Sequence, residues 1–210
     1  MLLGQAVRDE LSIVIRFMIK ERNRANRQHI ISTVNGWAGE GWLQVSTRPG
    51  KRLYVTCIQP ANSAAFAWNE DMTLTFAACG DPYWQDVFPI KAPVSGNSGS
   101  AEIHPIGTRP CVLEADITNA GDSAVTSLSL TANGKTISFA NLRLSKGKTL
   151  KLYYDERHIL RATVDGNGVL SYRTPASADD IQLIPAQANT IQFDANGTCN
   201  AVLYARGRYD

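Results

Sequence analysis

The fold is indicated most directly by the stretch Ser127-Leu-Ser-Leu-Thr-Ala-Asn133-Gly134-Lys-Thr-Ile-Ser-Phe139. Apolar and polar side chains alternate on both sides of the central Asn-Gly pair. A period of two places one face of a strand against a core and the other in water. Asn-Gly tolerates the positive φ angles that a two-residue hairpin needs. The stretch therefore predicts a β-hairpin with one buried face.

The same pattern extends through residues 117–210. Further alternating pairs are Leu150 and Leu152, Ile181 and Leu183, and Ile191 and Phe193, and further turn signals are Lys146-Gly147, Asp165-Gly166-Asn167-Gly168 and Asn196-Gly197. Many short strands with turns at this spacing are typical of an antiparallel sandwich or barrel. We expect this region to be a β-sandwich.

The first half of the chain combines strands with one helix. An alternating strand is expected from Leu11 to Ile19. A helix is then predicted over roughly 23–38, ended by Gly39 and Gly41. Its expected packing stripe consists of the apolar residues Ile30, Ile31, Val34, Trp37 and Ala38. Short strands are expected at 42–45, 52–58 and 67–76. The predicted fold class is mainly β, an α+β domain followed by a sandwich.

A composition change suggests where the two domains meet. Four prolines (Pro89, Pro93, Pro105 and Pro110) bracket the sequence Ser95-Gly96-Asn97-Ser98-Gly99-Ser100, and proline and glycine at this density favour a connector. We expect an α+β domain at 1–88, a linker at 89–100 and the sandwich at 101–210.

Composition and charge exclude several classes of protein. The formal net charge of the 210-residue chain is +2, so no overall field points to nucleic acid or to a membrane surface. No apolar run is long enough to span a bilayer, and charged residues follow Met1 too soon for a secretory signal peptide. We expect synthesis in the cytoplasm and reduced cysteines, because the sequence shows no secretion signal. The four cysteines include no Cys-x-x-Cys pair, which argues against a zinc site.

No catalytic, metal or cofactor site is expected. The three histidines are far apart in the sequence, and neither a nucleophile elbow nor a glycine-rich phosphate loop is present. The Asp179-Asp180 pair and the Asp155, Glu156 and His158 group are interpreted as polar residues of exposed turns.

A basic segment is the candidate subunit interface. It comprises Arg16, Lys20, Arg22, Arg24 and Arg27. Such a run can hold a nucleic-acid backbone, but a solvated face or a protein interface is the favoured interpretation. A helix N-terminus does not favour positive charge, so the segment suggests acidic partners, such as a neighbouring subunit.

A carbohydrate-binding sandwich is the alternative function. Sugars stack on exposed aromatic rings, and the weak candidate platform is Tyr153, Tyr154 and Tyr172. All four tryptophans lie in the first half of the chain, which weakens this platform, and alternating tyrosines also fit cross-strand pairs of a core.

Taken in order, several short motifs resemble those of the distal tail proteins of long-tailed phages. The motifs of the first half are the strand Leu11 to Ile19, the helix ending near Trp37, Arg48-Pro49-Gly50-Lys51, and Cys79-Gly-Asp81-Pro-Tyr83-Trp84. Those of the second half are Ile117-Thr-Asn119-Ala-Gly121-Asp, Asn189-Thr-Ile-Gln-Phe193 and the final strand Val202 to Tyr209.

The resemblance implies a structural protein of the virion tail tip, made in the bacterial host cytoplasm. Its first domain would form a ring, usually a hexamer, that joins the tail tube to the tail hub. Its second domain would be a galectin-like sandwich outside the ring, in a position to contact a host-surface glycan during host recognition. The family brings no catalytic residues and no cofactor.

The chain departs from the family pattern at its start. Family members commonly begin with further strands before the one that matches Leu11 to Ile19, whereas few residues precede it here. Three interpretations fit this departure: a truncated chain, a split gene, or an N-terminally shortened prophage copy. A missing strand would expose a sheet edge that invites pairing with another chain.

Overall fold

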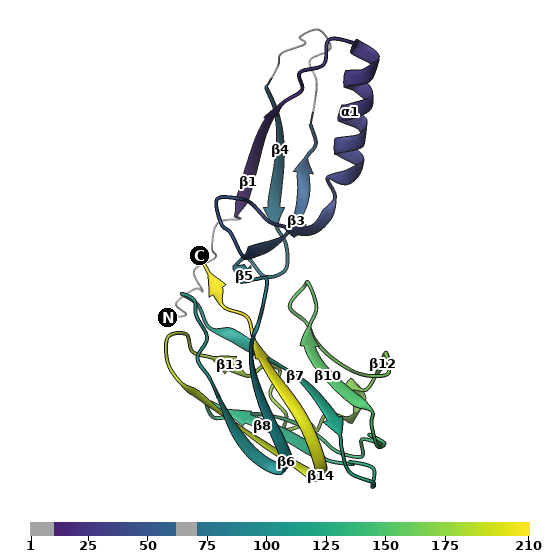
Figure 1. Ribbon diagram of the computed structural model, residues 1–210, viewed down its shortest axis with the longest axis vertical. Coiled ribbons are helices and arrows are strands. Elements are labelled where there is room, and N and C mark those ends of the chain that lie inside the picture. The colour runs from purple at the N-terminus through teal and green to yellow at the C-terminus, as the bar shows by residue number, and fades with distance from the viewer. Residues whose placement is uncertain (1–10, 62–70) are drawn as a thin grey trace, which may run out of the picture. The chain divides into compact units, whose positions relative to one another are not determined.

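The computed structural model describes residues 11–61 and 71–210, which belong to two compact units, Met1–Tyr83 and Trp84–Asp210. Strands dominate both units, and the strand pairs described below are all antiparallel. This confirms the predicted mainly β class, with an α+β unit followed by a sandwich-like unit (Figure 1). The strand expected at Ala67-Trp68 lies outside the described residues.

Unit 1 is a small sheet covered by one helix. Its strands are β1 (Ser12–Met18), β2 (Glu40–Leu43), β3 (Lys51–Gln59) and β4 (Asp71–Ala78), arranged in the order β1-β4-β3-β2. The register places Ile13 opposite Phe76 and Ile15 opposite Leu74. These pairs lie on the covered side of the sheet, whereas Val14 is 52% exposed.

Helix α1 (Arg24–Trp37) packs on unit 1 by a narrow stripe (Figure 1). Ile31 is the residue of α1 that is fully buried, and Val34 is half-buried. The amide of Asn35 anchors the helix, because it donates to the carbonyl oxygen of Ala61 (2.9 Å) and accepts from its backbone N–H (2.8 Å). The predicted stripe was therefore partly wrong, since Trp37 is 73% exposed.

Unit 2 is built around two long strands, β6 (Ile90–Ile103) and β14 (Asn189–Ala205). They pair along their lengths, with a register shift between Asp194 and Cys199. On its other edge β14 pairs with β7 (Cys111–Asn119) after the shift and with β8 (Leu128–Ala132) before it. The sheet thus curls around one core.

The remaining strands extend the two ends of this curled sheet. Beyond β7 come β10 (Thr149–Tyr154), β11 (Leu160–Val164) and β12 (Asn167–Gly168), and beyond β8 comes β9 (Lys135–Phe139). β13 (Gln182–Leu183) adds to β7, and β5 (Trp84–Asp86) pairs with β15 (Arg208–Tyr209). The core between the layers includes Phe139 and Phe193, each at most 2% exposed.

The predicted linker at 89–100 is not a connector, because it lies almost entirely within β6. Ala92 and Val94 are buried in the core of unit 2, and Gly96, Ser98 and Ser100 are in register with residues of β14. The division between the units falls after Tyr83 instead.

The turn signals were confirmed in part. Asn133 (φ 51°) and Gly134 (φ 76°) close the β8–β9 hairpin, and Asp165 and Gly166 take similar angles between β11 and β12. Asn196-Gly197 is not a hairpin turn, since it lies within β14 at the register shift. There the side chain of Asn196 accepts hydrogen bonds from the backbone of Thr126 and Ser127.

Candidate functional site

The basic segment of unit 1 surrounds the connection between β1 and α1. Arg16 is exposed on β1 opposite Thr73, and Lys20, Arg22 and Arg24 are exposed in the following loop and first helical turn. These four side chains present positive charge at the surface. A protein or nucleic-acid surface of opposite charge could bind there.

The fifth member, Arg27, is turned back onto the chain. Its Nη1 donates to the carbonyl oxygens of Glu21 (2.8 Å) and Arg22 (2.7 Å). Asn23 caps the N-terminus of α1, because its Oδ1 accepts from the N–H groups of Ala25 (2.9 Å) and Asn26 (3.3 Å). Arg27 therefore orders the loop that carries the other basic residues.

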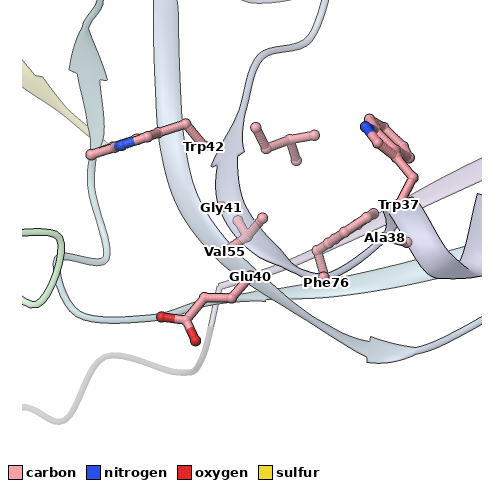
Figure 2. A pocket seen from close by; sticks show the side chains of 9 residues that line it. Trp37, Ala38, Glu40, Gly41, Trp42, Val55 and Phe76 are labelled. Atoms are coloured by element: carbon pink, nitrogen blue, oxygen red, sulfur yellow. The ribbon is translucent and has the colours of Figure 1, made fainter.

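A pocket of about 200 Å³, lined by aromatic and aliphatic side chains together with Glu40 and backbone, lies at the end of α1 on the same unit. Figure 2 shows Trp37 and Trp42 on opposite sides of this pocket, with Val55 and Phe76 between them. Trp37, at the end of the helix, is 73% exposed, and Trp42, on β2, is 36% exposed. Sequence reasoning missed this pocket because it assigned Trp37 to the packing stripe.

The Trp42 side of the pocket is held in place by its neighbours. The guanidinium carbon of Arg52 lies 3.8 Å from the centre of the Trp42 ring, and the ring of Tyr54 meets Trp42 edge-on at 5.1 Å. Tyr54 in turn donates from its hydroxyl to Glu40 Oε1 (3.0 Å). Trp42 is thus held by contacts within unit 1.

Among residues 11–61 and 71–210, no group of three or more potential ligands could hold a metal ion. The cysteines are reduced thiols, and burial raises the pKa of Cys111 to about 12, which keeps this thiol protonated and unreactive at neutral pH. In the part of the chain that the structure describes, no helix has both the length and the hydrophobicity needed to cross a bilayer.

The three candidate sugar-platform tyrosines do not share one surface. Tyr153 and Tyr154 are consecutive in β10, so their side chains leave opposite faces of the sheet. Tyr154 is half-buried and donates to the carbonyl oxygen of Asp179 (3.1 Å), whereas Tyr153 is 39% exposed. Tyr172 is 41% exposed at the end of a short 3-10 helix, Leu170–Tyr172.

Comparison with known proteins identifies the fold. No family model matches the sequence, and no curated protein matches it. Among solved structures, the chain is similar to the crystal structure of the SPP1 Dit protein, described as a paradigm of the hub adsorption apparatus in phages that infect Gram-positive bacteria. The TM-score is 0.67 over 98% of this chain and 85% of that chain.

The chain has the fold of SPP1 Dit. The two sequences are 12% identical over the match, so the likeness concerns the course of the backbone rather than particular side chains. Because the match covers nearly the whole chain, it includes both the helix-covered sheet of unit 1 and the curled sheet of unit 2.

Proposed function

We propose that this chain is a structural protein of a phage tail tip and acts by assembly rather than by catalysis. The observation that carries this proposal is the Dit fold, which extends over 98% of the chain. The described residues add support, since they offer exposed aromatic and basic side chains. In the full proposal, six copies form a ring that joins the tail tube to the tail hub.

Unit 1 is the part that we expect to form the contacts between copies. Trp37, a wall of this pocket, is 73% exposed and leaves a large apolar side chain in water. Tryptophan and arginine are the side chains most often found at the energetic centres of protein interfaces. We infer that the Trp37 pocket receives a second copy, and that Arg16, Lys20, Arg22 and Arg24 face acidic groups of a neighbour.

Self-association of the purified full-length chain tests this proposal. We expect light scattering to give a mass of several copies and negative-stain images to show rings. Trp37→Ala should shift the mass towards the monomer, because the pocket loses one wall and its partner loses apolar contact. Phe88→Ala is the matched control, since Phe88 is 83% exposed in unit 2 and its removal should leave the mass unchanged.

Two outcomes would contradict the proposal. A wild-type monomer at every concentration tested would exclude assembly of this chain with itself. A ring unaffected by Trp37→Ala would place the contact between copies elsewhere on the molecule.

A further inference from the structure

The chain contains four Asn-Gly pairs, and one of them lies in a different environment from the other three. The pairs are Asn35-Gly36, Asn133-Gly134, Asn167-Gly168 and Asn196-Gly197. An asparagine followed by glycine can lose its side-chain amide without an enzyme, because glycine has no Cβ to keep its backbone nitrogen away from the asparagine Cγ. The sequence alone therefore gives four equivalent candidates for this reaction.

Two of the four asparagines use their side chains to connect distant segments. The amide of Asn35 makes two hydrogen bonds to the backbone of Ala61, one as donor and one as acceptor. Asn133 Nδ2 donates to the carbonyl oxygen of Gln182 and to Asn189 Oδ1, both at 2.8 Å. Each of these side chains must lose its partners before its Cγ can turn towards the next backbone nitrogen.

Asn196 is held in the same way, at the register shift within β14. Its Oδ1 accepts from the N–H groups of Thr126 (2.9 Å) and Ser127 (3.1 Å). Its Nδ2 donates to Thr126 Oγ1 (2.7 Å). Both polar atoms of this amide are therefore engaged.

Asn167 is the exception. Its side chain is exposed, and it makes no hydrogen bond to any residue that the structure describes. It lies on β12, which is the outermost strand in the order that the described residues form (Figure 1). The amide can therefore rotate without breaking a bond.

The backbone nitrogen of Gly168 is accessible as well. The N–H of Val169 donates to the carbonyl oxygen of Ala162 (2.8 Å), and hydrogen-bonded pairs alternate with non-bonded pairs along antiparallel strands. Gly168, opposite Thr163, belongs to a non-bonded pair, so its N–H points away from β11. Apart from the chain neighbours of Gly168, nothing lies within 4 Å of the position that a Cβ would take there.

We propose that Asn167 is a site of spontaneous deamidation and that it reacts ahead of the other three asparagines. The Gly168 nitrogen loses its proton to hydroxide or another solvent base and forms a bond to Asn167 Cγ. The side-chain amide group takes up a proton and leaves as ammonia, and a five-membered succinimide results. Water then adds to either ring carbonyl and breaks its bond to the nitrogen, which yields aspartate or isoaspartate. The net reaction consumes water and releases ammonia, without an oxidant or a reductant.

The modification alters the outer edge of unit 2. A carboxylate at 167 lies two residues from Asp165, which already forms an ion pair with Lys148 (2.8 Å). Isoaspartate also adds a carbon atom to the backbone, which displaces Val169 from its hydrogen bond to Ala162. We expect β12 to separate from β11, and faster hydrogen exchange of residues 160–169 would show this. The inference concerns unit 2 alone and is independent of the proposed ring.

The test incubates the full-length chain in mildly alkaline buffer and digests samples at acidic pH, which stops the reaction. Peptide mass spectrometry gives the fraction of aspartate and isoaspartate at each of the four pairs. We expect Asn167 to react roughly tenfold or more faster than the other three, since each of those must first lose hydrogen bonds. The rate should rise with pH, because the attacking nitrogen must lose its proton.

Gly168→Val is the matched variant, because it keeps Asn167 and places a branched side chain beside the attacking nitrogen. The fold should tolerate this change, since Gly168 does not have a positive φ and the new Cβ meets open space. Deamidation of Asn167 should then fall by roughly tenfold, because the branched side chain is stiff and hinders the approach. An unchanged rate in Gly168→Val would overturn the succinimide route.

Two further results would overturn the inference. The first is a rate at Asn167 that does not exceed the rates at the other three pairs in the folded protein. The second is a preference for Asn167 that persists in concentrated denaturant, because the local sequence rather than the fold would then cause it. The mass of the chain in solution plays no part in these measurements, so failure here is distinct from failure of the ring proposal.

Discussion

At the scale of single residues, buried asparagines organise the irregular parts of unit 2. Asn189 is 1% exposed, and its Nδ2 donates to the carbonyl oxygens of Ile184 (2.8 Å) and Gln187 (3.0 Å). Its Oδ1 accepts from the Ile184 N–H and from Asn133 Nδ2, both at 2.8 Å. One side chain therefore ties the segment before β14 to the β8–β9 turn.

We expect Asn189→Ala to lower the free energy of unfolding of unit 2 by about 2 to 3 kcal/mol, because several buried backbone groups lose their partner. Urea unfolding monitored by circular dichroism measures this change. Asn200→Ala, on the exposed side of the same strand, is the control and should change stability by less than about 0.5 kcal/mol. Equal effects of the two substitutions would show that the Asn189 network contributes nothing.

At the scale of secondary-structure elements, α1 depends on its first turn more than on its apolar face. Ile31 is the residue of the helix that is fully buried, no acidic residue lies in its first turn, and its N-terminal N–H groups are satisfied by Asn23. A helix with so little buried surface is marginal without its cap.

Asn23→Ala should therefore destabilise α1 by about 1 kcal/mol. Hydrogen exchange is carried out on the intact protein and measured, after digestion, by mass spectrometry of a peptide that spans residues 24–37. This peptide should exchange faster in the variant than in wild type. Asn26→Ala is the matched control, because it makes the same chemical change three residues later, inside the helix, where alanine is the better helix former. Exchange that is unchanged in Asn23→Ala would mean that packing alone holds the helix.

The strands of unit 2 show what a single sequence can predict. Hairpins such as β8–β9 were predictable, because alternation and an Asn-Gly turn lie within a few residues of each other. β6 was not predictable, because its serines and glycines are typical of a linker. It forms a strand by pairing with β14, about a hundred residues away in the sequence, and this pairing places Ile90 opposite Ala205.

At the scale of the whole molecule, the boundary between the units can be tested directly. All residues of the sandwich core lie after Tyr83, and β6 contributes Ala92 and Val94 to it. We expect the fragment 84–210 to fold alone, with dispersed amide resonances and a cooperative thermal transition. The fragment 101–210 should not fold, because β14 would lose most of its partner strand.

A folded 101–210 fragment would contradict this expectation and restore the linker interpretation. An unfolded 84–210 fragment would instead mean that unit 2 needs unit 1.

The pairing of β6 with β14 also bears on how the protein is made. β14 follows β6, β7 and β8 in the chain and supplies a partner edge to all three. The hairpin β8–β9 and the pair β10–β11 lie wholly before β14, so they can form earlier during synthesis. The curled sheet can close only after residues 189–205 have left the ribosome, and until then β6 has no partner strand.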